Sequence, residues 1–354
     1  MENELLNELK ACPSCKSLRI GEFFRRTSLT SISAIFDTLL FKALDTVPRV
    51  LRYDNCKDCG LLFLNPQWSE KALGRMYGPD NIYRKISLEG LRLTTSLTQA
   101  DEIDLLRHID PSIDDEHAVH RQHFARSQWV RAQMGELFEN QRTTVADVGA
   151  GFGAAQKALE RVGFKYLGFD SSQEMSKMSK KFHRDVNAVS FANLPQEFET
   201  KVDIIYTSQF MEHVNKPVQC LEFLRECLKA GGLVFVDVPS YEFLPFNLSN
   251  FRAGNLGQNS MNWGHMCHFN HVSLDNTFRL AGFKTKGYTY CDGDLWMLAE
   301  MVAKPLATPP PLKRPNILRQ RFNISVISPV AGAYVGFKSI AKRLLQIAGL
   351  RKKM

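Results

Sequence analysis

The sequence predicts an α/β protein built on a doubly wound sheet, with a small cysteine-bearing domain before it and a basic tail after it. Between residues 143 and 303, short β-rich runs alternate with amphipathic stretches, the pattern of a mostly parallel sheet with crossover helices. Two C-x-x-C pairs lie in the first 80 residues, and a proline-rich break opens a terminal segment without Asp or Glu. The expected divisions are a head (1–80), a helical connector or lid (81–142), an α/β domain (143–303) and a tail (304–354).

Composition describes an ordinary globular chain. Its 354 residues are 44% hydrophobic and 23% charged, which fits about two domains and excludes a disordered or collagen-like protein. The net charge of +8 belongs to the tail, which holds 11 of the 45 Lys and Arg residues and leaves 34 basic against 37 acidic residues elsewhere. The body therefore offers no basic surface for nucleic acid.

The N-terminal sequence MENELLNELK has acidic residues where a signal peptide needs a basic region. No apolar run reaches the length of about 18–20 residues that spans a bilayer. We expect a cytoplasmic protein.

Four cysteines of the head form the two C-x-x-C pairs: Cys12, Cys15, Cys56 and Cys59. In a cytosolic chain such pairs favour thiolate ligation of zinc over disulfides, and four sulfurs make a closed structural site. A redox pair and unliganded thiols are the alternatives.

Periodicity locates the elements of the α/β domain. A stripe of apolar residues at spacings of three and four marks the helix expected at 217–229, which Gly231 and Gly232 should end. Residues 283–303 read as two strands joined by the turn CDGD, a hairpin at the sheet edge. The other strands are expected at 144–148, 166–170, 188–191, 203–207 and 233–238, and the other helices at 153–162 and 173–184.

A glycine-rich turn carries the strongest chemical signal. A buried strand ends in Asp147, and Gly149, Gly151 and Gly153 precede a helix, so that the backbone can approach a ligand and helix N–H groups point at it. Asp170 closes the next strand, where an acid can accept both hydroxyls of a ribose. The pattern indicates a nucleoside-containing cofactor. A nicotinamide or flavin dinucleotide also fits G-x-G-x-x-A, and a turn without ligand remains possible.

Four segments in order, VADVGAGFG, GFDSS, VDIIYTSQFMEHV and LKAGGLVFVDVP, resemble the successive motifs of the class I S-adenosylmethionine-dependent methyltransferases. The resemblance covers about residues 120–303. It implies a Rossmann-like sheet of seven strands whose last strand is antiparallel, in agreement with the hairpin. Methyl transfer needs in-line alignment, and a hydroxyl acceptor also needs a general base.

The resemblance also implies roles for particular residues. Asp147 would approach the methionine amino group, and Asp170 with the adjacent Ser171 would hold the ribose. Asn193 stands where many relatives have an acid, and Gln209 replaces the first acid of the E-x-x-E-H pattern of a metal-binding subset, which argues against a metal there. The other positions are the methionine-tail residues Gly149, Ala150 and Gly151, the adenine neighbours Asn193 and Leu194, and the pocket residues Gln209 and His213.

Histidine is the natural general base near neutral pH. His265 and His268 follow the fifth strand of the domain, where loops face the ligand, and match an H-x-x-HF segment that many sugar and small-molecule methyltransferases have there. Metal binding or plain packing are the alternatives for this segment. Tyr241 is a second candidate, for abstraction of a carbon-bound proton. His117, His120 and His123, at spacings of three, would form one stripe on a helix.

The segment 56–77 resembles the zinc-knuckle head found in front of methyltransferases encoded among polysaccharide and secondary-metabolite genes. This resemblance implies O-methylation of a hydroxyl of a sugar or glycan precursor. Alternatives are a C-methyltransferase acting on a nucleotide-linked keto sugar, a zinc-headed ribosomal RNA guanine methyltransferase, and a non-catalytic cofactor-binding module that docks a partner. The negative charge of residues 1–303 disfavours RNA, because neutralisation of phosphates dominates affinity for nucleic acids.

The tail ends in a stretch, 337–354, that can form a basic amphipathic helix. Such a helix predicts a peripheral contact with the inner face of a membrane. Docking on its own domain or on a partner is the alternative.

Overall fold

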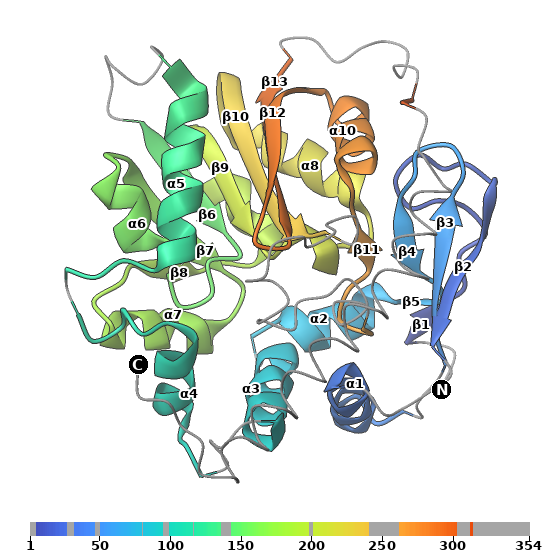
Figure 1. Cartoon of the computed structure of the whole chain (residues 1–354), viewed down its shortest axis with the longest axis horizontal. Coiled ribbons are helices and arrows are strands. Elements are labelled where there is room, and N and C mark those ends of the chain that lie inside the picture. Colours follow the sequence, from blue (N-terminus) through green and yellow to red (C-terminus); the bar gives the residue numbers. More distant parts are fainter. Residues whose placement is uncertain are drawn as a thin grey trace, which may run out of the picture.

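The computed structural model (Figure 1) describes residues 5–26, 32–46, 50–79, 81–94, 99–115, 117–135, 143–197, 201–240, 262–302 and 312–313. The predicted tail helix and Tyr241 lie outside these residues. No helix in the described ranges combines the length and the apolarity that a membrane span requires.

A mixed seven-stranded sheet forms the centre of the molecule, in the order β12-β13-β10-β9-β6-β7-β8. The five strands from β10 to β8 run parallel, and β13 pairs antiparallel with both of its neighbours. The sheet with one reversed strand, as expected from the sequence, is confirmed. Its strands are β6 (Thr144–Val148), β7 (Lys165–Asp170), β8 (Val186–Ala188), β9 (Val202–Ser208), β10 (Leu228–Pro239), β12 (Phe283–Cys291) and β13 (Asp294–Met301).

Several predicted bounds were wrong by a few residues: the strand expected at 233–238 is β10, which begins at Leu228, and the helices expected at 153–162 and 173–184 are α6 (Gln156–Arg161) and α7 (Gln173–Lys181). The strand expected at 188–191 is β8 and ends at Ala188, because Phe191 begins the 3-10 helix η3 (Phe191–Glu197). The helix expected to end at residue 229 is α8 (Pro217–Glu226), and Leu228 already pairs with Val202 in the sheet. Gly231, with a φ of 72°, lies within β10 at a register shift instead of ending a helix.

Alternate residues of the strands face two different cores. Val145 packs with residues of α5 (Arg121–Met134) and α6 (Gln156–Arg161), whereas Ala146 packs with residues of α8 and α10 (His271–Leu280). The sheet is therefore covered on both sides, as Figure 1 shows. The described residues also form α1 (Ile32–Ala43), α2 (Glu70–Tyr77), α3 (Ile82–Thr94), α4 (Glu102–Ile109), α7 (Gln173–Lys181) and the 3-10 helix η4 (Met211–His213).

The CDGD turn forms the predicted hairpin between β12 and β13. Cys291 pairs with Asp294, which leaves a loop of Asp292 and Gly293 with φ angles of 51° and 96°. Positive φ at both central residues is the type I′ geometry that matches the twist of paired strands.

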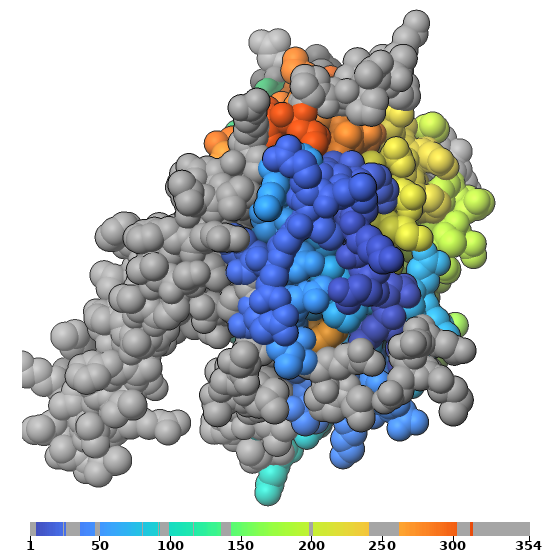
Figure 2. Space-filling view, turned by 90° about the vertical axis from the view of Figure 1, so that its right-hand side faces the viewer, coloured from blue at the N-terminus to red at the C-terminus, as the bar shows by residue number. Residues whose placement is uncertain are grey.

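The head shares a sheet and a core with the α/β domain. Its four-stranded sheet has the order β11-β4-β3-β2, and β11 (Cys267–His268) comes from the histidine segment of the α/β domain, some 200 residues further along the chain. The core of the head is also continuous with the core under α8 and α10. Figure 2 shows the head in blue over the middle of one side of the molecule. Its strands are β1 (Leu6–Asn7), β2 (Ile20–Arg26), β3 (Leu51–Cys56), β4 (Leu62–Leu64) and β5 (Gln67–Trp68).

The predicted histidine stripe on one helix is wrong. Helix α5 begins at residue 121 with His120 as its extended N-cap, so that only His123 of the three lies in the helix. The Asp115 carboxylate accepts a hydrogen bond from the backbone N–H of His117, a local turn that competes with helix formation.

Candidate functional site

The backbone of the glycine turn after β6 lies close to neighbouring groups, as predicted. Gly149 has a φ of 77°, and a Cβ there would lie 2.7 Å from the ring of Phe210. The backbone N–H of Gly151 donates to Asp170 Oδ2 at 2.8 Å, and that of Ser172 donates to Asp170 Oδ1 at 2.9 Å. These hydrogen bonds hold the glycine turn next to Asp170 at the end of β7.

Two cavities lie at the carboxyl ends of the parallel strands. The Asp170 cavity, about 310 Å³, is lined by Asp170, Ser171 and apolar residues that include Val189 and Leu194. The Asp147 cavity, about 410 Å³, is lined by Asp147 and by residues of α5. Both are bordered by five common residues, so one elongated ligand can contact both. These residues are Asn81, Arg84, Gly149, Gly151 and Gln209.

The acids of the two cavities differ in their hydrogen bonds. Asp147 is buried and accepts one hydrogen bond, from the Tyr166 hydroxyl at 3.1 Å, and burial raises its pKa to about 7. Burial also raises the pKa of Asp170, although its two backbone donors oppose that shift. Near neutral pH, Asp147 can therefore change its charge state when a cation binds beside it.

The structure brings most of the predicted cofactor residues to these cavities. Ala150 lines the Asp147 cavity, and Ser171, Leu194 and His213 line the Asp170 cavity. Asn193 is the exception: it is exposed on η3 and borders neither cavity.

The three candidate histidines lie in a row, with ring centroids 4.9 Å apart for His213 and His265 and 5.5 Å apart for His265 and His268. His213 lines the Asp170 cavity, and His265 packs against the side of His213. His268 is fully buried in β11 with its ring edge against Tyr53, 5.1 Å between centroids. It borders neither cavity, and its catalytic role stays a prediction.

Hydrogen bonds define the tautomer of His213. Its Nδ1 lies 2.8 Å from the carbonyl oxygen of Gly264, which can only accept, and 2.9 Å from the Tyr77 hydroxyl. That hydroxyl also lies 2.9 Å from the Gly264 oxygen, to which it can donate, so a proton on Nδ1 satisfies all three groups and leaves the lone pair on Nε2. Burial lowers the pKa of His213 to about 4, and the ring is neutral at pH 7. Nε2 faces Glu212 Oε1 at 3.8 Å, and burial raises the pKa of Glu212 well above its usual value.

Glu212, His213 and His265 also form a group whose ligand atoms all lie within 4.8 Å of one another. Such a group can hold a metal ion. Gln209 replaces an acid of the metal-binding pattern, and the expectation that no metal binds here stays a prediction.

Sequence reasoning did not identify the cavity wall that the end of the head and the start of the connector form. Tyr77, Asn81, Tyr83 and Arg84, from the end of α2 and the start of α3, all line the Asp170 cavity. The Ser171 hydroxyl donates to the carbonyl oxygen of Tyr77, which ties this wall to the end of β7. No motif marks these residues, and their closeness to the glycine turn is a tertiary contact.

An ion cluster at the strand ends was also missed. Arg126 of α5 is buried and lies 3.0 Å from Asp237 and 2.9 Å from Asp294. Burial raises the pKa of Asp294 to about 7. One of three arginines in a polar helix gives no sequence signal for such a pair.

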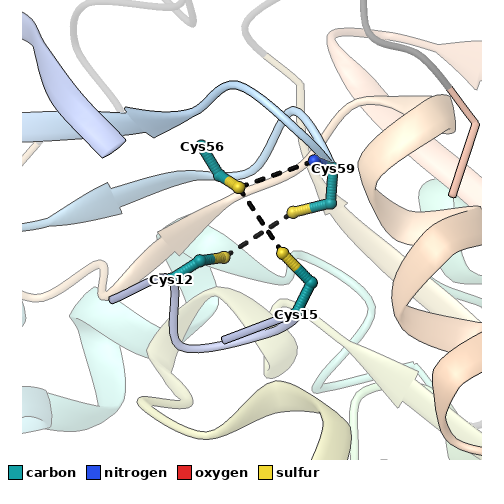
Figure 3. Close-up of side chains that lie close together, drawn as sticks. All are labelled: Cys12, Cys15, Cys56 and Cys59. Atoms are coloured by element: carbon teal, nitrogen blue, oxygen red, sulfur yellow. Dashed lines mark hydrogen bonds between the residues drawn. The ribbon is translucent and has the colours of Figure 1, made fainter. Parts of the chain in front are cut away.

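The four cysteines of the head converge, as Figure 3 shows. The Sγ atoms of Cys12 and Cys59 lie 3.6 Å apart and those of Cys15 and Cys56 3.5 Å apart. All four lie within 4.8 Å of one another. Zinc–sulfur bonds of about 2.3 Å in a tetrahedron place sulfurs just under 4 Å apart, so the four thiols fit a zinc ion.

Residues 117–286 match the family model described as "Methyltransferase domain". With the mixed seven-stranded sheet, this match defines a Rossmann-like α/β domain of the methyltransferase type.

Two curated proteins show similarity over part of this domain. The ubiquinone biosynthesis O-methyltransferase of Hydrogenovibrio crunogenus is 24% identical over 116 residues, which are 31% of this chain and 48% of that protein. The mitochondrial ubiquinone biosynthesis O-methyltransferase of Dictyostelium discoideum is 27% identical over 118 residues, 29% of this chain and 37% of that protein. The chain thus spans less than half the length of either relative.

Similar solved structures include an S-adenosylmethionine-dependent methyltransferase from Clostridium acetobutylicum. It has 12% identity and a TM-score of 0.41, covering 57% of this chain and all of that one. Magnesium protoporphyrin IX methyltransferase from Synechocystis with bound SAH has 13% identity and a TM-score of 0.40, covering 59% of this chain and 98% of that one.

Proposed function

We propose that this chain is an S-adenosylmethionine-dependent O-methyltransferase. The observation that carries the proposal is the pair of adjoining cavities at the glycine turn, one bordered by Asp170 and the other by Asp147. A nucleoside fits the first through its ribose, and a charged amino-acid end fits the second. The match of residues 117–286 to methyltransferase domains supports the same cofactor.

Different residues bind different parts of the cofactor. Asp170 holds the ribose hydroxyls, and Val189 and Leu194 contact the adenine. Gly149 and Gly151 let the backbone approach the ligand, and Asp147 pairs with its ammonium group. The cofactor supplies an electrophilic methyl group, so what remains for the protein is alignment and removal of a proton from the acceptor.

We assign the proton-accepting role to His213 instead of His265 or His268, because it is the histidine that lines the Asp170 cavity. Its Nε2 lone pair can accept the proton of an acceptor hydroxyl while Nδ1 remains bonded to Gly264. Glu212, 3.8 Å from Nε2, stabilises the imidazolium when its carboxyl is ionised.

The acceptor that we propose is a hydroxyl of a sugar or glycan precursor, from the resemblance of the head to those of polysaccharide-associated methyltransferases. The two curated relatives are named for ubiquinone biosynthesis, which makes a phenol the competing acceptor class. Both classes present an ionisable O–H, and both suit a histidine base.

We also propose that the four cysteines hold a structural zinc ion. Four thiolates close the coordination sphere and leave no position for a substrate or water. The metal would fix the head, and with it Tyr77 of the cavity wall, against the α/β domain.

The test is transfer of a labelled methyl group to matched panels of nucleotide sugars, glycans and phenols, with product analysis to separate O- from C-methylation. His213→Gln should lower kcat about 100-fold or more, a far larger effect than any change in the Kd for SAH, since His213 also lines the cavity. His265→Gln is the matched control and should keep most of the activity. Failure of the wild-type protein to bind SAH would refute the proposal, and O-methylation that survives His213→Gln would refute the base assignment.

A further inference from the structure

A third cavity, of about 890 Å³, lies between α10 and β12, the strand at one edge of the seven-stranded sheet. Figure 1 shows α10 beside the hairpin to which β12 belongs. None of the residues that line this α10–β12 cavity borders the Asp170 or the Asp147 cavity. Sites for small ligands usually have volumes of about 300–1,000 Å³. The α10–β12 cavity is therefore separate from the proposed cofactor site and has room for a ligand of its own.

Four cationic side chains from distant parts of the sequence meet at the α10–β12 cavity. They are Arg279 of α10, Lys284 and Lys286 of β12, and Lys313. Asp275 is the one acid among the described lining residues, and its Oδ2 lies 3.1 Å from Lys313 Nζ. Four cations and one acid leave a net charge of +3 on the lining, whereas residues 1–303 carry 34 basic against 37 acidic residues. A concentration of positive charge on an otherwise acidic body attracts anions.

Protection of an edge strand explains only part of this charge. Lysines on an edge strand such as β12 prevent it from pairing with other chains. The register shift between Thr285 and Gly287 makes Lys286 the extra residue of a bulge, which serves the same purpose. Arg279 and Lys313 lie outside β12, however, and line the same cavity. Edge protection does not require cations on these other segments, and a bound anion does.

An aromatic pair lies at one end of the α10–β12 cavity. The ring of His271, the first residue of α10, stacks on the ring of Tyr288 of β12, with 4.9 Å between centroids and 9° between planes. The Tyr290 hydroxyl lies 3.0 Å from His271 Nδ1 and accepts the backbone N–H of His271 at 3.2 Å, which holds this ring in place. Tyr288 is nevertheless 49% exposed. A half-exposed aromatic ring beside cations fits a ligand that combines rings with anionic groups.

We propose that the α10–β12 cavity binds an anionic glycan, one that carries phosphate or carboxylate groups. Its sugar rings pack on Tyr288, and the cations bind its charged groups. The inference rests on the proposed function, in which the acceptor is a sugar or glycan precursor, and adds a site for a part of that glycan away from the methylated hydroxyl. RNA also combines rings with phosphates, but the net negative charge of residues 1–303 disfavours it.

Strand β13 connects this cavity with the proposed methyl-transfer site. Asp294 of β13 lines the Asp147 cavity, and Met297 of the same strand lines the α10–β12 cavity. Three residues of an extended strand cover about 10 Å. A glycan of a few sugar units that passes around the β12–β13 hairpin can therefore contact both cavities.

Calorimetry at low ionic strength with matched probes tests the inference without any turnover. Phosphomannan oligosaccharides supply phosphates on sugar rings, and oligogalacturonate supplies carboxylates. Dephosphorylated mannan has the rings alone, and inorganic polyphosphate of equal charge has the anions alone. The wild-type protein should bind one of the two anionic glycans about 10-fold or more tightly than it binds either the neutral mannan or polyphosphate.

Two variants separate the contributions of charge and stacking. Lys284→Gln/Lys286→Gln should raise the Kd for the anionic glycan about 10-fold, and Tyr288→Ala about 3-fold to 10-fold. Lys177→Gln/Lys180→Gln is the matched control, because it removes the same charge from exposed positions of α7 that do not line the cavity. The control should bind the glycan as the wild-type protein does. All variants should keep the wild-type Kd for SAH, which also shows that they are folded.

Four results would each overturn the glycan site: no binding of either anionic glycan, equal binding of polyphosphate, tighter binding of single-stranded RNA of equal charge, or an equal loss in the control variant. Binding of SAH in the same preparations reports on the proposed function separately. A wild-type protein that binds SAH and no glycan loses the glycan site and keeps the proposed function. A wild-type protein that does not bind SAH refutes the proposed function, whatever the glycans do.

Discussion

Replacing His268 with Phe separates a buried structural histidine from a catalytic one. The ring of His268 is fully buried, and neither of its nitrogens has a hydrogen-bond partner within the described residues. Burial lowers its pKa to about 3, with a smaller contribution from His213. A phenyl ring keeps the contact with Tyr53 and removes two unsatisfied polar atoms.

The magnitude follows from the linkage between protonation and folding. The unfolded chain protonates this histidine below a pKa of about 6.5, whereas the folded protein holds it neutral down to pH 3. The stability that the neutral ring contributes is present above pH 6.5 and is lost as the pH falls toward 3. Between pH 7 and pH 5 the wild-type protein should lose about 2 kcal/mol relative to His268→Phe. Raised carboxyl pKa values, such as that of Asp147, act in the opposite direction but are common to both proteins and cancel.

The assay is urea unfolding of both proteins at pH 7 and pH 5, followed by tryptophan fluorescence. The difference in unfolding free energy between variant and wild type should grow in favour of the variant at pH 5. Methyl transfer at pH 7 should be retained. An equal difference at both pH values would refute the buried, uncharged state of His268, and loss of turnover in a stable variant would restore it as a catalytic candidate.

Three further predictions concern the cofactor, the cysteines and the ion cluster. Asp170→Ala should raise the Kd for SAH about 10-fold to 100-fold by calorimetry, and an unchanged Kd would remove the ribose assignment. About one zinc ion per chain should appear in elemental analysis, and Cys12→Ser should lower both the zinc content and the Tm; a metal-free protein of full stability would contradict the zinc site. Arg126→Met should destabilise the fold by about 3–5 kcal/mol in chemical unfolding, because Asp237 and Asp294 lose their cation. A loss below about 1 kcal/mol would show that these acids are held protonated.

The α/β domain was largely predictable because its signals are local. The bounds of β6 match the prediction residue for residue, since a short apolar run, an acid and a glycine turn follow one another within a dozen residues. The β12–β13 hairpin was predictable for the same reason: Asp292 and Gly293 determine the turn and the register of its strands.

The candidate site was predictable only where it belongs to those motifs. Asp147, Asp170 and the glycine turn lie at the cavities as expected. Tyr77 of the head and Arg84 of the connector reach the same place through tertiary packing, which no periodicity encodes. His268 fitted a family segment, yet pairing with Leu62 draws it into the sheet of the head. Pairing across so long a stretch of chain is decided by the whole fold and not by local sequence.

The position of β11 at the edge of the head's sheet also determines the order in which the protein can be completed during synthesis. Leu62–Leu64 leaves the ribosome early, but its partner strand Cys267–His268 follows about 200 residues later, a delay on the order of 10–40 s at usual elongation rates. Through that interval the nascent head presents an apolar edge strand with open hydrogen-bonding groups, the kind of surface that pairs with other chains. Early metal capture by the cysteines would hold the nascent head compact, and the arrival of the histidine segment would then cover its edge.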